Sequence, residues 1–410
     1  MEKVKNRWLI AMSAIWIHIS IWSIYAYSVM KKPLEDLLWW ESTDISFWFS
    51  IAILCLGLSA AFLWKYVEKY WPRAAGIFCS LFYGIGVAGI GLAVTMQSLV
   101  LFYLTFGVLW GIGLWVGYIT PVSTLVKWFP DRRGLATGMA IMGFGFSSMI
   151  FWPLMAKLFV WVWIANAFYI LWAIYFTLIF LSSLYIAPPK KWWLPENMKN
   201  AESKKNHVKD LAQCTAPEAA KTLRFYLMWV MFFINITCWI AIISVASPMA
   251  QDVAGLTAMQ AATMVGFLGI FNGTGRLVWS SLSDYLWRAN TYTLFFAIQI
   301  IAFFTLPLIV NAILFQTILF LILTCYGWGF SICPAFLWDL FGTKQLWAIH
   351  GYTLTAWAAA GVVWPTLVSY IRETTWDYKL TLYIFATGFV IAFILSILMK
   401  LNIKKIQTNN

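Results

Sequence analysis

Residues 98–126 read SLVLFYLTFGVLWGIGLWVGYITPVSTLV, an uninterrupted stretch without a charged side chain. About 20 apolar residues in a helix are enough to cross the hydrocarbon core of a bilayer. A transmembrane β-barrel would instead show segments of about ten residues in which polar and apolar positions alternate. The stretch therefore predicts a membrane-spanning helix.

Apolar runs of this kind fill most of the chain. Its 410 residues are 62% hydrophobic and 11% charged, with a mean hydropathy of +0.77. Soluble domains are about 45–50% apolar and about 25% charged. We therefore predict an all-α integral membrane protein with twelve transmembrane helices, the first of them retained because no small-residue cleavage site follows it. The runs are 8–30, 46–65, 74–96, 98–126, 134–157, 164–187, 223–246, 257–281, 290–310, 312–338, 346–371 and 379–401.

A long polar segment divides these runs into two sets of six. We predict an N-terminal half at 1–187, a cytoplasmic linker at 188–222 and a C-terminal half at 223–410. The linker is rich in Lys, Glu and Asn, and we expect it to be solvated near anionic headgroups. Two such halves are typical of transporters that bind substrate between repeats, near the middle of the bilayer.

The distribution of Lys and Arg predicts the orientation. With the N-terminus inside, the cytoplasmic segments hold 22 of these residues and the opposite loops hold 5. Positive residues collect on the cytoplasmic side of membrane proteins. We therefore predict a multi-pass protein of the plasma (inner) membrane with both termini cytoplasmic. The same bias accounts for the net charge of +12, so no nucleic-acid partner is expected.

One cation lies near the middle of a predicted span: Arg276, in FNGTGRL at 271–277. An arginine at that depth costs about 3 kcal/mol or more and usually serves an ion pathway or a ligand. Its planar guanidinium matches a carboxylate, so we predict that it binds a substrate carboxylate; a structural ion pair is the alternative. Asn272 lies four residues earlier, on the same helix face, and can bond the guanidinium or the ligand.

Other candidates are weaker. Tyr25, Tyr118, Tyr326 and Phe330 could line a cavity, although aromatic residues in spans more often serve packing. His18 is a candidate proton carrier or a structural histidine. The six cysteines show no CxxC spacing, and we expect no metal, no cofactor and no enzyme activity, because no catalytic motif stands at helical spacing. A receptor would need a larger extramembrane domain.

Several motifs point to a known family. They are GYITP at 117–121, KWFPDRRGLATG at 127–138, NGTGR at 272–276, SDYLWR at 283–288, DLFGT at 339–343, and YAYSV at 25–29 with Pro33 and Leu34. With these motifs the chain resembles the major facilitator superfamily, and within it the oxalate/formate antiporter family, which is related to the monocarboxylate transporters. The resemblance implies a twelve-helix fold of two pseudo-symmetric halves that moves a small carboxylate by alternating access.

The resemblance also assigns residues. It makes Arg276 the substrate-binding arginine of helix 8, Tyr118 the tyrosine of helix 4 and Tyr25 that of helix 1. Trp357 stands where oxalate exchangers of the family carry a lysine. Because one cation leaves a dianion poorly neutralised in a low-dielectric site, we expect a monocarboxylate such as lactate, formate or pyruvate. An oxalate/formate-type dicarboxylate exchanger and an exporter of another solute class are the alternatives.

Two charged clusters and one further acid complete the predictions. Asp131, Arg132 and Arg133, with Asp284 and Arg288, are predicted to form a cytoplasmic gate. Asp252, in the loop before helix 8, could pair with Arg276 in one state and so couple transport to protons; a solvated loop carboxylate is the alternative. The expected partners are a small carboxylate, protons and the lipid bilayer, with no obligate protein partner.

The tryptophan content is unusual. The chain holds 27 Trp and 25 Gly, although helix contacts in membranes rely on small residues. Trp71 and Trp287 stand where the resembling motifs have glycine in tight turns. We hypothesise that UGA codons meaning glycine in the source organism are translated here as tryptophan; genuine tryptophan with compensating repacking is the alternative. Further positions of this kind are Trp22, Trp39, Trp110, Trp115, Trp172, Trp328, Trp347 and Trp364.

Overall fold

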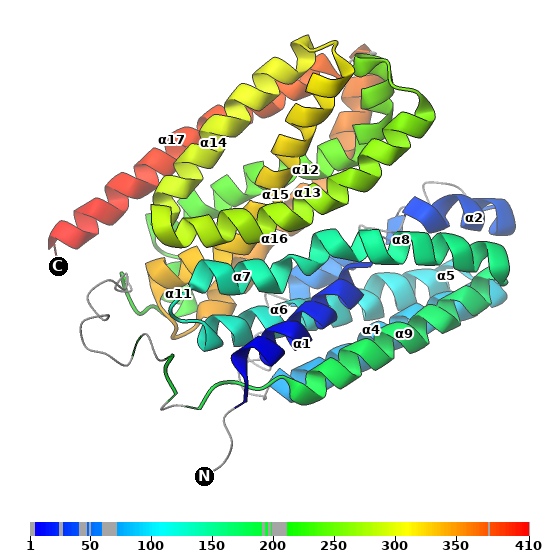
Figure 1. Ribbon diagram of the computed structural model, residues 1–410, viewed down its shortest axis with the longest axis horizontal. Coiled ribbons are helices and arrows are strands. Elements are labelled where there is room, and N and C mark those ends of the chain that lie inside the picture. Colours follow the sequence, from blue (N-terminus) through cyan, green and yellow to red (C-terminus); the bar gives the residue numbers. More distant parts are fainter. Residues whose placement is uncertain are drawn as a thin grey trace. The chain divides into compact units, whose positions relative to one another are not determined.

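The computed structural model of the chain is built from helices (Figure 1). It describes residues 5–23, 28–40, 47–48, 51–59, 72–190, 193–195, 198, 211–375 and 378–409. The chain divides into two compact units, Met1–His207 and Val208–Asn410. The division falls within the predicted linker.

The N-terminal unit contains α1 and α2, three long helical stretches and α9. Residues 51–59 are also helical. The helix α5, the π-helical turn η2 and α6 follow one another without a break, so that Leu99–Trp128 forms one stretch of the length needed to cross a bilayer. The bounds are α1 (Arg7–Ile21), α2 (Ser28–Leu38), α4 (Pro72–Thr95), α5 (Leu99–Phe102), η2 (Tyr103–Leu109), α6 (Trp110–Trp128), α7 (Arg133–Ile141), α8 (Gly143–Trp161) and α9 (Ile164–Tyr185).

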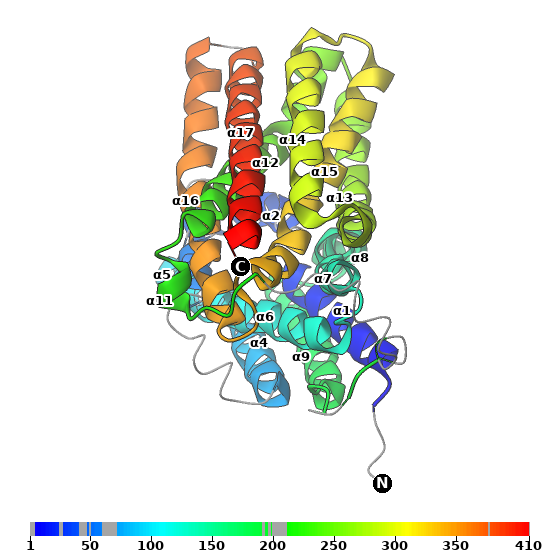
Figure 2. The same ribbon diagram turned by 90° about the vertical axis from the view of Figure 1, so that its left-hand side faces the viewer.

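The C-terminal unit contains six long helices. In Figure 2 the helices α14, α15, α16 and α17 stand beside one another along much of their length. The bounds are α11 (Ala216–Ala219), α12 (Leu223–Ala254), α13 (Ala258–Leu286), α14 (Arg288–Thr305), the 3₁₀ turn η4 (Leu306–Leu308), α15 (Ala312–Phe341), α16 (Leu346–Thr375) and α17 (Lys379–Asn409).

The predicted all-helical membrane fold is confirmed. Seven helical stretches of the described residues are long and apolar enough to cross a membrane. They are Pro72–Thr95, Leu99–Trp128, Arg133–Trp161, Ile164–Tyr185, Arg288–Leu308, Ala312–Phe341 and Lys379–Thr408. Shorter apolar helices occur at Arg7–Ile21 and Leu223–Trp239, while α13 and α16 coincide with the predicted eighth and eleventh spans. The predicted second span, 46–65, lies largely outside the described residues.

The first predicted span differs from the structure. A single helix over 8–30 was expected, whereas α1 ends at Ile21 and a separate helix, α2, begins at Ser28. This second helix carries Lys31, Lys32, Glu35 and Asp36, so its hydropathy resembles that of a loop. Leu, Lys and Glu nevertheless favour helix, which explains why a charged segment is helical here.

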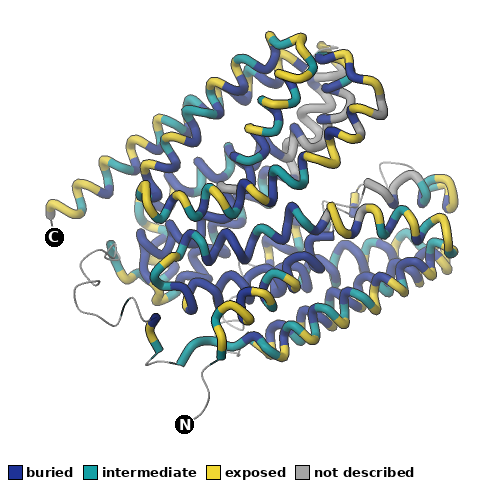
Figure 3. The backbone as a smooth tube through the Cα atoms, viewed as in Figure 1, coloured by how far each residue is buried: buried dark blue, intermediate teal, exposed yellow. Residues whose placement is uncertain are grey.

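Exposed apolar side chains mark the faces available to lipid. Along α4 the residues Leu81, Ile85 and Leu92 recur on one side of the helix and are each exposed. The opposite side is buried against neighbours within the unit, and Figure 3 shows this alternation of buried and exposed residues along the long helices. Such stripes are expected where a helix borders hydrocarbon rather than water.

The end of the predicted linker is attached to the second unit. The backbone N–H groups of Leu211 and Cys214 donate to the carbonyl oxygens of Asp339 (2.8 Å) and Phe341 (2.9 Å). The N–H of Ala216 donates to Oε1 of Gln345 at 2.8 Å. Residues 211–216 are therefore bound along the turn between α15 and α16, whereas the whole linker was expected to be solvated.

Candidate functional site

Arg276 lies in the interior of α13 and is fully buried, with 0% of its surface exposed. Its Nε donates to Oδ1 of Asn272 at 3.0 Å. Residues four apart on a helix share a face, and the structure brings these two side chains together as expected. The hydrogen bond orients the guanidinium plane.

Aromatic rings of α15 face this guanidinium. The guanidinium carbon is 5.6 Å from the ring centroid of Tyr326 and 5.7 Å from that of Phe330. Both distances fall within the range of cation–π attraction. Phe330 contacts Trp357 of α16 edge to face at 5.3 Å, and Tyr326 stacks on Trp239 of α12 at 3.9 Å. The C-terminal unit thus gathers five predicted site residues and adds Trp239.

Gly327 makes room for Arg276, and it was not among the predicted site residues. A Cβ at Gly327 would lie 2.4 Å from Cγ of Arg276 and 2.5 Å from the carbonyl oxygen of Asn272. A Cβ at Gly275 would lie 2.3 Å from the carbonyl oxygen of Thr324. Small residues let two membrane helices approach closely, so α13 and α15 meet at the level of the arginine because both carry glycine there.

A polar pair near this region was also missed. Nε2 of Gln299, on α14, donates to Oδ1 of Asn235, on α12, at 3.2 Å, and both residues are buried. A Cβ at Gly329 would lie 2.0 Å from Nδ2 of Asn235. The available signal was an amide in the interior of each of two apolar runs, since polar residues in spans are usually functional or structural anchors.

The N-terminal unit holds a second cluster of predicted residues. Nε2 of His18 lies 3.0 Å from the carbonyl oxygen of Tyr118. A carbonyl oxygen only accepts hydrogen bonds, so Nε2 carries the proton. The imidazole stacks on the ring of Tyr118 at 5.7 Å and contacts the ring of Phe144 at 5.4 Å. Tyr25, the third candidate from this half, lies outside the described residues.

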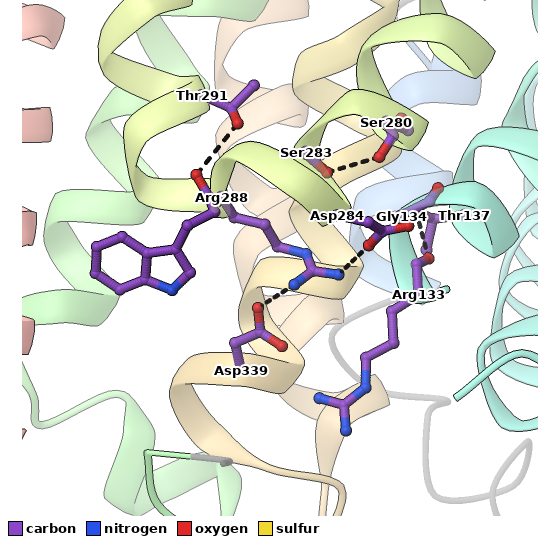
Figure 4. A network of polar contacts seen from close by, with 10 residues as sticks. Arg133, Gly134, Thr137, Ser280, Ser283, Asp284, Arg288, Thr291 and Asp339 are labelled. Carbon is purple, nitrogen blue, oxygen red and sulfur yellow. Dashed lines mark hydrogen bonds and ion pairs between the residues drawn. The ribbon is translucent and has the colours of Figure 1, made fainter. Parts of the chain in front are cut away.

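Arg288, the first residue of α14, holds two carboxylates at once. Its Nη2 is 2.7 Å from Oδ1 of Asp284, and its Nη1 is 2.5 Å from Oδ2 of Asp339 (Figure 4). The pair Asp284 and Arg288 was expected from the sequence. Asp339, in the last turn of α15, was not assigned to it. The three residues tie the ends of α13, α14 and α15 together.

In the other predicted gate segment, residues 131–133, an aspartate is again paired with an arginine of another helix. Asp131 pairs with Arg7, at the start of α1, at 3.2 Å, and the guanidinium of Arg7 also lies 4.7 Å from the ring centroid of Phe129. Arg132 is exposed, and Arg133 begins α7, where its carbonyl oxygen accepts from the Thr137 hydroxyl. The sequence analysis did not identify Arg7 as the partner of Asp131.

Asp252 lies on a helix rather than in the expected loop. It occupies the last turn of α12, three residues before Gly255, whose φ of 62° ends the helix. The residue is exposed. The helix continues further than predicted because Gly255, with its left-handed backbone, is the stop signal.

The sequence profile of the Major Facilitator Superfamily matches residues 8–365. The chain belongs to this family, whose members are secondary transporters, and it is a multi-pass membrane protein rather than an enzyme.

Individual relatives share about a quarter of their residues with this chain. The chain is 26% identical over 351 residues to the uncharacterized MFS-type transporter YhjX of Escherichia coli, covering 85% of this chain and 84% of the relative. It is 24% identical over 360 residues to the oxalate:formate antiporter of Oxalobacter formigenes, covering 87% and 83%. It is 23% identical over 363 residues to monocarboxylate transporter 12 of Mus musculus, covering 81% and 72%.

Solved structures agree on the fold. The proton:xylose symporter XylE superposes with a TM-score of 0.74 at 12% identity, covering 95% of this chain and 94% of XylE. The transporter FucP, in the outward conformation, superposes with a TM-score of 0.70 at 12% identity, covering 96% and 99%. These likenesses confirm the predicted major facilitator fold.

Proposed function

We propose that this transporter moves a small monocarboxylate by alternating access and that Arg276 binds the carboxylate. The main support for this proposal is the buried guanidinium in the interior of α13, which is oriented by Asn272 and faced by the rings of Tyr326 and Phe330. An intramembrane cation is costly and marks a substrate pathway. A carboxylate is complementary to it in both charge and planar geometry.

The chemistry of the surroundings favours a single carboxylate. Asn272, Tyr326, Phe330 and Trp357 are uncharged, so they shape the site while Arg276 supplies its positive charge. One cation and one carboxylate form a neutral pair, whereas a dianion would carry an excess charge into a low-dielectric site. The relatives support the substrate class: one is named an oxalate:formate antiporter and others monocarboxylate transporters.

The second candidate function is oxalate/formate-type exchange, which the named antiporter relative favours. The two functions differ in the number of positive charges that the site needs. At the position where the resembling oxalate exchangers have a lysine, this chain has Trp357, which contacts Phe330. We therefore rank the monocarboxylate first.

Coupling follows from the same charge balance. A carrier with its substrate bound is neutral at the site and reorients more easily than the empty carrier, which favours exchange or proton symport. Asp252, exposed at the end of α12, and His18, buried against Tyr118, are the proposed proton-coupling residues. The excess of Lys and Arg supports a plasma-membrane orientation with both termini cytoplasmic.

The two ion-pair clusters are the proposed cytoplasmic gate. Asp131, with Arg132 and Arg133 beside it, lies in the N-terminal unit, and Asp284 with Arg288 lies in the C-terminal unit. Ion pairs of this kind can form in one state and break in the other. In variants that still fold, neutralising these residues should change turnover more than substrate affinity.

Uptake into proteoliposomes tests the proposal. Labelled lactate, formate, pyruvate and oxalate are compared for the wild-type protein, for Arg276→Gln and for Lys404→Gln, which removes an exposed cation far along α17 as a matched control. We expect uptake of a monocarboxylate by wild type and Lys404→Gln, and none by Arg276→Gln. Preference for oxalate would favour the second function, and undiminished uptake by Arg276→Gln would exclude Arg276 as the ligand.

A further inference from the structure

Trp287 has a backbone conformation that tryptophan rarely adopts. Helix α13 ends at Leu286 and α14 begins at Arg288, so this one residue makes the turn, with φ 66° and ψ 127°. Positive φ brings Cβ of a bulky residue against its own backbone, whereas glycine adopts it freely. The turn also sets the Asp284–Arg288 ion pair, whose partners lie on either side of it.

Trp39 shows the same feature at a different helix end. It follows α2, which ends at Leu38, and has φ 59°. The position after a helix is commonly left-handed and is filled by glycine. The Trp39 side chain is 90% exposed, so little packing offsets the backbone cost. Among the described non-glycine residues, only Gln97 also has positive φ, so tryptophan accounts for two of three.

Trp110 lies where two helices approach closely. A Cβ at Gly86 of α4 would lie 2.7 Å from Cβ and 2.9 Å from Cα of Trp110. On the same part of α6, a Cβ at Gly111 would lie 2.8 Å from the carbonyl oxygen of Ala52, and one at Gly113 would lie 2.5 Å from the N atom of Tyr83. Small residues are usual at close membrane-helix contacts, but the Trp110 side chain hydrogen-bonds that of Tyr83, so its indole is used and this position does not require glycine.

Two further tryptophans fit their surroundings poorly. The rings of Trp22 and Phe144 have centroids 3.5 Å apart at an angle of 34°, closer than the roughly 4.5–7 Å that aromatic pairs prefer. The indole N–H of Trp115 is buried without a hydrogen-bond acceptor in the described part of the chain. A buried donor in that state destabilises the fold.

Other tryptophans are well accommodated. The indole N–H groups of Trp128, Trp229 and Trp279 donate to the Ala187 carbonyl oxygen (2.7 Å), the Thr355 hydroxyl (2.9 Å) and the Thr324 hydroxyl (3.2 Å). Buried tryptophan normally makes such a bond. Trp128, Trp229 and Trp279 therefore use their indoles, whereas Trp39 and Trp287 stand at backbone positions that suit glycine.

We infer that the native protein carries glycine at 39 and 287, and also at 22 and 115, because UGA means glycine in its source organism. Tryptophan at 128, 229 and 279 is then genuine and encoded by UGG. The composition agrees: average glycine usage of about 7% predicts about 29 glycines in this length, and membrane helices use more, yet the chain has 25. The turn between α13 and α14 is then a glycine turn.

Mass spectrometry of the protein purified from its source cells tests the inference directly. Peptides covering positions 39 and 287 should carry glycine, and peptides covering 128, 229 and 279 should carry tryptophan. The gene should have UGA at the first group and UGG at the second. Tryptophan at 287 in the native protein, or a UGG codon there, would overturn the inference.

A second measurement does not require the source cells. Trp287→Gly should raise the thermal midpoint of the purified chain by about 2 °C, because the backbone strain of a tryptophan at positive φ is relieved. Trp229→Gly, the matched control, should lower the midpoint, because it removes a used indole from a helix. A midpoint that falls as far in Trp287→Gly as in Trp229→Gly would contradict glycine at 287.

Discussion

Two buried arginines, Arg276 inside α13 and Arg288 just beyond its end, have opposite surroundings. Arg288 is held by the carboxylates of Asp284 and Asp339. Arg276 is oriented by the side-chain amide of Asn272 and faced by two aromatic rings. The two carboxylates neutralise Arg288 and tie the helix ends together, whereas the proposed role of Arg276, among an amide and two rings, is to bind the carboxylate of the substrate.

The largest expected effect comes from Arg288. Arg288→Gln removes the cation that two buried carboxylates share, and breaking a buried ion pair costs about 3 kcal/mol or more. We expect a large fall in thermal midpoint and in folded yield, measured by fluorescence-detected gel filtration. Arg132→Gln, which removes an exposed cation, is the control and should leave both unchanged. An equal fall in thermal midpoint in Arg288→Gln and Arg132→Gln would show that the two ion pairs of Arg288 do not stabilise the fold.

The next effect concerns the space beside Arg276. Gly327→Ala places a methyl group against Cγ of Arg276 and the carbonyl oxygen of Asn272, and overpacking of this kind costs about 1–3 kcal/mol. We expect uptake to fall strongly. Gly266→Ala is the control on the same pair of helices, because no atom lies within 4 Å of a Cβ there, and its uptake should be normal. Normal uptake by Gly327→Ala would show that the contact is not needed.

A charge-conserving change tests the geometry of the proposed ligand. Arg276→Lys keeps a cation but loses the planar fork, and it also loses the Nε bond to Asn272. We expect less than about a tenth of wild-type uptake, with a raised KM. Lysine at full activity would mean that charge alone suffices. The assay is initial-rate uptake over a range of substrate concentrations.

The smallest expected effect is that of Asp252. Its exposed position on α12 predicts that Asp252→Asn leaves folding and carboxylate exchange intact and reduces only the stimulation of uptake by an inward proton gradient. Counterflow measures carboxylate exchange and pH-dependent uptake measures proton stimulation, so the two assays run side by side distinguish these effects. If His18→Gln removes the stimulation while Asp252→Asn does not, the coupling residue lies in the N-terminal unit.

The sequence predicted the features that depend on local pattern. Lipid requires long apolar runs, so the spans could be located, and the spacing of four between Asn272 and Arg276 places them on one face. The partners Asp339 and Arg7 could not be found in this way, because they lie 51 and 124 positions from Arg288 and Asp131. Gly327 is one of 25 glycines, and only the packing of α13 on α15 distinguishes it.

Equilibrium binding of labelled lactate and formate to purified protein tests the central claim most directly. The thermal midpoints of Arg276→Gln and Lys404→Gln are measured first and must agree, so that a loss of binding cannot be a loss of fold. We predict that Lys404→Gln binds as wild type does and that Arg276→Gln binds about 100-fold more weakly, equivalent to about 2.7 kcal/mol. Equal binding by both variants would contradict the assignment of Arg276 as the carboxylate ligand.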